Sequence, residues 1–301
     1  MAVEDSSTDV ESRLAWEAKQ RAPAALAAAL AALLTFAGAV WGSVLFTDVP
    51  RSGLVEALDL AAQPGAVGEQ ESLRAATYAF YDENKASVLL SSVVRALGLL
   101  ALGWAITYLA VAVRGRRPEF PKLALYLPAI GAVLSAVATM LSTVATMLSV
   151  SDFLAGARTL DDADAINSSG LLLTAQFINL PGLLALALAL VLVSLNAMKV
   201  GLLTKFVGVL GVITGGLLIF PIGSPLPIVQ CFWLVLLSIL FLQRWPAGQP
   251  PAWRTGRAEP WPSGAEIRKQ RQAAAAARRG EAPPPEPVAA GSARRKRKRR
   301  T

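Results

Sequence analysis

The sequence predicts an all-α, polytopic transmembrane helical bundle with six spans and with both termini in the cytoplasm. Hydrophobic residues make up 54% of the chain and charged residues only 17%, a more apolar balance than a water-soluble domain has. The apolar residues fall in long runs, of which 88–113 carries a single charge and reaches roughly 39 Å as a helix. Lys and Arg gather between these runs and at the end of the chain, a pattern typical of cytoplasmic segments.

The first span is predicted at 23–46. It follows an N-terminal segment, 1–22, that is too long and too acidic for the start of a signal peptide, so we expect this segment to stay uncleaved in the cytoplasm. Pro23 stands at the start of the span, where its missing amide donor costs a helix little. Gly38 and Gly42 are four residues apart and share one helix face, which favours close packing against another helix.

The second span, 88–113, fixes the orientation of the other segments. It is followed by Arg114, Arg116 and Arg117, which place its C-terminal end in the cytoplasm. The loop before it, 47–87, is rich in acids and is therefore predicted to lie outside. Apolar and aromatic residues within this loop predict interfacial helices that cap the bundle.

The third and fourth spans are predicted at 123–150 and 171–198, joined by an acidic external loop at 151–170. The third span contains a seven-residue repeat, VATMLST then VATMLSV, which places hydroxyl side chains along one helical stripe. The stripe consists of Ser135, Thr139, Ser142, Thr146 and Ser149. Packing against a facing helix is the favoured role of this stripe, and a hydrated pathway is the alternative. In the fourth span, Pro181 predicts an interrupted helix.

Two shorter apolar segments follow, at 206–222 and 226–243. Two tilted spans are favoured over a re-entrant hairpin, and either arrangement leaves the rest of the chain in the cytoplasm. The tail, 244–301, is basic and rich in Pro and Ala. It is predicted to be largely disordered, apart from a helix near 264–279 that begins with a capping box.

The tail ends in a basic run that predicts contact with anionic lipids. The run consists of Arg294, Arg295, Lys296, Arg297, Lys298, Arg299 and Arg300. Nucleic acid would attract the same charges, but no stacking platform or nucleic-acid-binding fold accompanies the run, so this partner is not favoured. The expected partners are the lipid bilayer, anionic lipids at the tail, and a membrane-protein partner or a second copy of the chain.

Arg95 is the one Lys, Arg, Asp or Glu placed well inside a predicted span, which makes it a candidate ligand-binding residue. Gln176 and Asn179 lie at a similar predicted depth in the fourth span. These three side chains are predicted to form one polar cluster in the outer half of the bundle. The alternative is that Arg95 reaches toward the outer surface, because helical side chains lean toward the N-terminus of their helix.

Little in the sequence supports catalysis. The absence of His removes the usual proton shuttle, His-containing metal sites and the Ser–His and Cys–His nucleophile pairs, and the single cysteine, Cys231, excludes an internal disulfide. We therefore expect no catalytic residues, no cofactor and no metal. The favoured function is a non-enzymatic structural or scaffold component of the plasma membrane. The alternative is a small transporter or channel subunit that uses the polar cluster in the outer half of the bundle.

The C-terminal quarter of the chain carries a family resemblance. Residues 196–266 contain NAMKVGLLTKFVGVLGVITGG and, further on, FWLVLLSILFLQRWPAGQPPAWRTGRAEPWPSGAE. This stretch resembles uncharacterised multi-span membrane proteins of actinobacteria. The resemblance implies a bacterial plasma-membrane protein, and it brings no catalytic residues with it.

Overall fold

A computed structural model describes residues 2–45, 47–50, 53, 58, 62, 70–220, 227–246, 248–261, 268 and 272–273 of the chain. The chain divides into two compact units, Met1–Trp261 and Pro262–Thr301, and the helices named here belong to the first. They are α1 (Ala2–Leu45), α3 (Ala75–Glu83), α4 (Lys85–Arg116), α5 (Leu123–Ala155), α6 (Leu160–Asn167), α7 (Gly170–Lys199), α8 (Lys205–Ile219), α9 (Ile228–Phe241) and α10 (Pro251–Thr255). The described part contains no strand, only an isolated bridge between Glu71 and Thr159.

Several sequence predictions fall wholly or largely outside the described residues. The basic run 294–300 is outside them, as is almost all of the helix predicted near 264–279. Most of the first half of the predicted outer loop 47–87 is also outside them, together with 221–226 between the last two apolar segments.

Four helical segments are long and apolar enough to cross a membrane, and they cover the positions predicted for the first four spans. They are Val10–Leu45, Lys85–Arg116, Leu123–Ala155 and Leu160–Lys199. The all-helical fold class is therefore confirmed for the described residues. In contrast, α8 and α9 have 15 and 14 residues. They reach only about 22 and 21 Å, less than the roughly 30 Å of a bilayer core, so six complete spans stay a prediction.

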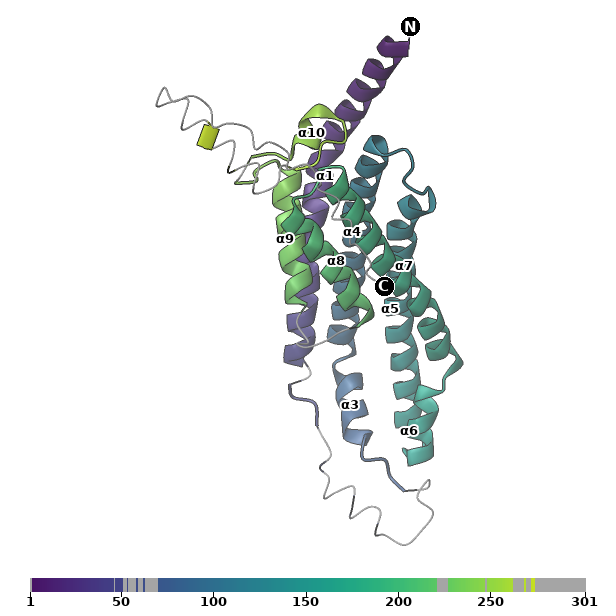
Figure 1. The fold of residues 1–301 in the computed structure, drawn as a ribbon. Helices are drawn as coiled ribbons and strands as arrows, with labels where there is room; N and C mark the ends of the chain where they lie inside the picture. Colours follow the sequence, from purple (N-terminus) through teal and green to yellow (C-terminus); the bar gives the residue numbers. More distant parts are fainter. Residues whose placement is uncertain are drawn as a thin grey trace, which may run out of the picture. The chain divides into compact units, whose positions relative to one another are not determined.

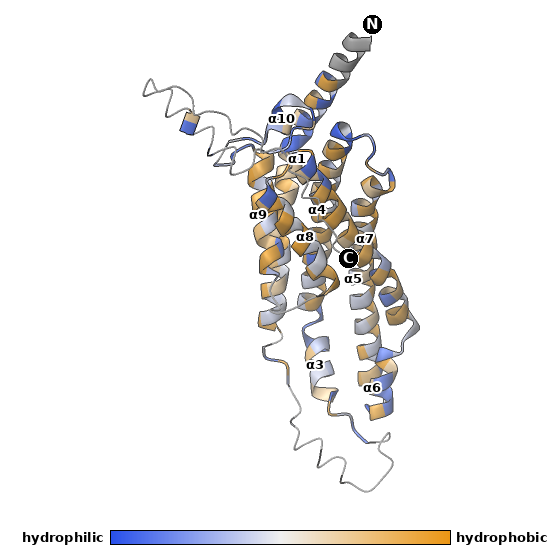
Figure 2. Cartoon of the chain, in the orientation of Figure 1, coloured by the Kyte–Doolittle hydropathy of each residue, from blue (hydrophilic) through white to orange (hydrophobic). Residues whose placement is uncertain are grey.

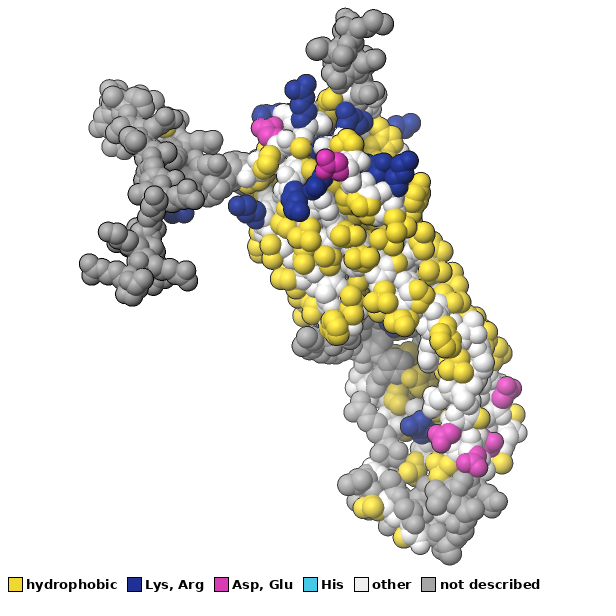
Figure 3. Space-filling model, turned by 45° about the vertical axis from the view of Figure 1, so that its right-hand side comes forward, with side chains coloured by type: hydrophobic (Ala, Val, Ile, Leu, Met, Phe, Trp, Pro, Cys, Tyr) yellow, Lys and Arg dark blue, Asp and Glu magenta, His cyan; other side chains and the backbone are white. Residues whose placement is uncertain are grey.

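The surface of these helices is divided into zones. Hydrophobic residues run along α1, α4, α5 and α7, and hydrophilic residues gather at the helix ends (Figure 2). In the space-filling view, Lys and Arg side chains gather at the end where α10 lies, and Asp and Glu side chains lie mostly at the end of α6 (Figure 3). Large apolar side chains between the two ends point outward, among them Phe177, which is 77% exposed. An apolar surface between two polar ends is what a lipid bilayer requires.

The helices pack closely around α4 and α5. α4 lies between α1 and α5, α7 packs on α5 and α8, and α9 packs on α1 (Figure 1). Two glycines bring α5 and α7 into near backbone contact. A Cβ atom on Gly131 would lie 2.6 Å from the backbone N of Leu186, and one on Gly182 would lie 2.9 Å from the backbone N of Ser135. Such close approach is how helices gain packing energy in lipid, where apolar side chains alone supply little driving force.

Two helices continue through prolines where the sequence suggests a boundary or a break. α1 is one continuous helix, so Pro23 lies in its interior and the N-terminal segment extends the first span. α7 continues through Pro181, so the helix is not broken there. Each proline removes one backbone hydrogen bond. The adjoining turns are fixed by packing, because Ala24 of α1 and Leu186 of α7 are completely buried.

Short helices lie at the acidic end of the bundle. α3 is found in the second half of the predicted outer loop, and α6 in the loop between the third and fourth spans. The two loops are joined, because the backbone N of Ser72 donates to the carbonyl of Arg158 at 2.8 Å. Tyr78 of α3 also meets Phe153 of α5 edge-on, with ring centres 4.9 Å apart. These contacts give this end of the bundle a small apolar core of its own.

Candidate functional site

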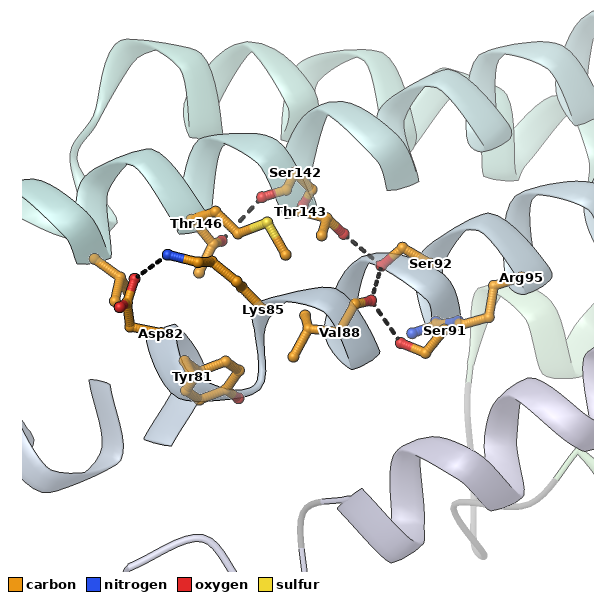
Figure 4. A pocket seen from close by; sticks show the side chains of 12 residues that line it. Tyr81, Asp82, Lys85, Val88, Ser91, Ser92, Arg95, Ser142, Thr143 and Thr146 are labelled. Carbon is orange, nitrogen blue, oxygen red and sulfur yellow. Dashed lines mark hydrogen bonds and ion pairs between the residues drawn. The ribbon is translucent and has the colours of Figure 1, made fainter. Parts of the chain in front are cut away.

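Arg95 lies in a pocket of about 220 Å³ formed by α3, α4 and α5 (Figure 4). We call this the Arg95 pocket. Its polar lining consists of Tyr81, Asp82, Lys85, Ser91, Ser92, Arg95, Ser142, Thr143 and Thr146. Its apolar lining consists of Val88, Met147 and Val150. Most of the lining residues are therefore polar, although two of the helices that form the pocket are long and apolar enough to cross a membrane.

The Arg95 side chain is exposed and extends along α4 toward Ser91, in the direction of the N-terminal end of the helix (Figure 4). A Cβ atom on Gly38 of α1 would lie 2.8 Å from the Arg95 Cγ, so this glycine makes room for the stem of the arginine. The guanidinium makes no hydrogen bond or ion pair with any residue that the structure describes. This geometry is compatible with both the ligand-binding and the surface-reaching interpretations of Arg95.

Hydroxyl groups of α4 and α5 meet across the pocket. Ser92 Oγ and Thr143 Oγ1 lie 2.6 Å apart. On the predicted stripe, Thr139 donates to the Ser135 carbonyl at 2.8 Å and Thr146 to the Ser142 carbonyl at 2.9 Å, both within α5. Thr139 and Thr146 therefore donate their hydrogen bonds within α5. The contact with α4 is made by Thr143, which lies beside the stripe.

The charges of the pocket sum to a positive value. Lys85 Nζ lies 3.2 Å from an oxygen of Asp82, and the side chains are 63% and 37% exposed, so this ion pair is weak. Burial, and secondarily the phenol of Tyr78, raises the pKa of Tyr81 above its ordinary value, so Tyr81 stays neutral. Arg95 and Lys85 against Asp82 leave one net positive charge.

Gln176 and Asn179 do not join Arg95. Both side chains are exposed on α7, and neither lines the Arg95 pocket. Their neighbours Phe177 and Leu180 are 77% and 60% exposed, so this stretch of α7 faces away from the bundle. The predicted three-residue cluster is not formed in the structure. The polar neighbours of Arg95 come from α3, α4 and α5 instead.

A buried polar site lies at the other end of α4. Arg116 donates to both carboxylate oxygens of Glu17 on α1, at 2.5 and 2.9 Å, and the two side chains are 1% and 3% exposed. Arg116 also donates to the backbone carbonyl of Ala252 at 2.8 and 3.1 Å, and its guanidinium lies 5.3 Å from the centre of the Trp253 ring. We call these four residues the Arg116 cluster. It joins α1, α4 and α10 at one point.

Aromatic rings extend the Arg116 cluster. Tyr108 stacks on Trp253 with ring centres 5.8 Å apart, and it meets Phe241 edge-on at 5.0 Å. The Tyr108 hydroxyl donates to the backbone carbonyl of Glu17 at 3.2 Å, and Trp253 Nε1 donates to that of Leu202 at 2.9 Å. Both buried rings therefore have partners for their polar atoms, which is the condition for burying Tyr and Trp without a penalty.

The folded bundle extends past its predicted boundary at residue 243. Beyond α10, the backbone N of Glu259 donates to the carbonyl of Val200 at 3.1 Å. Gly201 has a φ of 79°, and the Glu259 carbonyl occupies the space that a Cβ atom on Gly201 would take. The first compact unit runs to Trp261. The tail was predicted to be largely disordered, and its described residues up to 261 are an ordered part of this unit.

Sequence reasoning missed the Arg116 cluster because its members are far apart in the chain. Arg116 is 99 positions from Glu17 and 136 from Ala252. In the sequence, Arg116 is one of three arginines that follow the second span. Their charge accounts for the orientation of that span, so nothing marks Arg116 as different from the other two. The available signal was Trp253, since a tryptophan is unusual in a Pro-rich segment that stays disordered.

The described residues contain no group of three or more Cys, Asp and Glu side chains that could hold a metal ion. No protein-family model, no curated protein and no solved structure matches the chain. The resemblance to actinobacterial membrane proteins therefore stays a prediction.

Proposed function

We propose that the protein is a non-enzymatic, six-span scaffold component of the bacterial plasma membrane, which holds the start of its basic tail against the cytoplasmic end of its bundle. The observation that carries this proposal is the Arg116 cluster. One buried arginine binds a carboxylate of α1, a backbone carbonyl of α10 and the face of Trp253. A tail that served only as a charge signal for orientation would need no such attachment.

The distribution of charge supports the orientation in this proposal. Arg114, Arg116 and Arg117 lie at the end of α4 that contacts the start of the tail. Asp and Glu side chains lie mostly at the opposite end (Figure 3). Because segments rich in Lys and Arg stay in the cytoplasm, the Arg116 cluster is placed inside the cell and the Arg95 pocket toward the outside. Both termini are then cytoplasmic.

Trypsin treatment of inside-out membrane vesicles tests the attachment of the tail. Arg254 and Arg257 are exposed side chains, but their backbone adjoins Ala252, which Arg116 holds. Because proteolysis requires local unfolding, we expect trypsin to spare both bonds in the wild-type protein and to cut them in Trp253→Ala. Mass spectrometry of the fragments gives the sites.

The matched control is Trp41→Ala. Trp41 is 44% exposed and lies on α1, outside the Arg116 cluster. This variant should leave both bonds as protected as in the wild-type protein. Rapid cleavage after Arg254 and Arg257 in the wild-type protein itself would contradict the proposed attachment.

A small transporter or channel subunit is the second candidate function, and the Arg95 pocket is the observation that favours it. A polar pocket with a net positive charge beside a long apolar helix suits a step in anion passage. Anion flux into proteoliposomes that is lost in Arg95→Gln would favour this function over the scaffold.

A further inference from the structure

We propose that the Arg95 pocket binds a phosphate group, presented either by a phospholipid headgroup or by a free phosphate ion. The pocket and the Arg116 cluster lie at opposite ends of α4. The proposal goes beyond the scaffold function and does not depend on it.

Arg95 supplies the recognition. A guanidinium carries five N–H donors in a planar fork that matches two phosphate oxygens at once. No described residue accepts a hydrogen bond from Arg95. Gly38 leaves space for the aliphatic part of the Arg95 side chain. Arg95 carries a full positive charge, and a phosphate would provide its counter-charge.

The remainder of the pocket suits an anion. The Ser142 side chain lines it and has no hydrogen-bond partner among the described residues, so its hydroxyl is available to donate. The carboxylate of Asp82 is paired with Lys85, which reduces its repulsion of an anion. The volume of about 220 Å³ is many times the roughly 10–15 Å³ that a single water molecule needs, which leaves room for a phosphate group.

The depth of the pocket matches the level of lipid phosphates. A bilayer core of roughly 30 Å takes about 20 helical residues. Counted back along α4 from Arg114, the core ends near Val94. Counted forward along α5 from Leu123, it ends near Ser142. These two independent counts both place the far edge of the core at the Arg95 pocket, which is where headgroup phosphates lie.

The thermal stability of the purified full-length protein in detergent measures binding, because a ligand of the folded state raises the unfolding temperature. The probes are short-chain phosphatidylglycerol, phosphatidylcholine of the same chain length and inorganic phosphate. Half-maximal concentrations are compared for the wild-type protein, Arg95→Gln, Arg95→Lys and Ser142→Ala. The control is Arg74→Gln, which removes an exposed arginine directly before α3, outside the pocket.

We expect Arg95→Gln to weaken binding at least about tenfold, the size of one lost charge-assisted hydrogen bond. Arg95→Lys should lose less, because it keeps the charge but not the fork. Arg74→Gln should bind like the wild-type protein. The comparison of Arg95→Gln with Arg74→Gln isolates the pocket from the basic tail, which also attracts anionic lipid.

The probes distinguish the source of the phosphate. A response to phosphatidylglycerol without a response to inorganic phosphate identifies a lipid, and equal responses identify a free anion. The same half-maximal concentration in the wild-type protein, Arg95→Gln and Arg95→Lys would overturn the proposal. If Arg95→Gln does not fold, the test uses Arg95→Lys and Ser142→Ala. Unchanged binding in both of these variants would also overturn the proposal.

Discussion

At the scale of single residues, the structure depends on one buried charge pair. The side chains of Arg116 and Glu17 are 1% and 3% exposed. Removing one partner leaves the other charge buried without its counter-charge, which costs about 3–5 kcal/mol. We expect Arg116→Gln and Glu17→Gln each to lower the unfolding temperature in detergent. The double variant Glu17→Gln with Arg116→Gln should be less destabilised than the two single effects added together.

Arg254→Gln is the control for this pair. Arg254 belongs to the same end of the bundle, but its side chain is exposed and should tolerate the change within about 0.5 kcal/mol. If Arg116→Gln and Glu17→Gln unfold at the same temperature as Arg254→Gln, the pair does not stabilise the fold.

At the scale of helices, the contact between α5 and α7 depends on glycine. A Cβ atom on Gly131 would lie 2.6 Å from the backbone N of Leu186, whereas one on Gly42 would meet nothing within 4 Å. Gly131→Ala should therefore push α7 away and destabilise the protein by about 1–3 kcal/mol. Gly42→Ala should be neutral or slightly stabilising, because alanine favours a helix. Chemical or thermal unfolding of the two variants tests this, and equal effects would count against the packing described.

The helices were more predictable from the sequence than their contacts. Long apolar runs place α4, α5 and α7 to within a few residues, because length and hydropathy alone decide which segments fit a bilayer. Pro23 and Pro181 suggested a helix start and a helix break, but both lie inside continuous helices. Packing on both sides of each proline outweighs its local cost. Gly38 and Gly42 form one motif, yet only Gly38 packs against α4, and spacing alone does not reveal which glycine a neighbour covers.

The candidate site shows the same limit. Charge alone singled out Arg95 in the sequence, and its position along the predicted span gave an expected depth in the membrane. Depth along a helix does not determine the direction in which a side chain points, and Gln176 and Asn179 lie on an exposed face of α7. The hydroxyls that share the pocket come from residues such as Thr143 and Ser142, whose approach depends on how α4 and α5 pack.

At the scale of the whole chain, both proposals require a defined orientation in the membrane. In the proposed orientation, the Arg116 cluster would hold the start of the tail in the cytoplasm, and the Arg95 pocket would face the outer headgroups. Positive charge at one end and acidic charge at the other favour this arrangement (Figure 3). The two sites would exchange compartments if the chain were inserted the other way round.

Labelling of single cysteines in intact cells tests this orientation most directly. In a Cys231→Ser background, Ser168→Cys reports the α6 end and Ala258→Cys reports the start of the tail, and both positions are exposed. A membrane-impermeant maleimide should label Ser168→Cys in intact cells and Ala258→Cys only after lysis. Labelling of Ala258→Cys in intact cells, or equal labelling of both positions without lysis, would contradict the account.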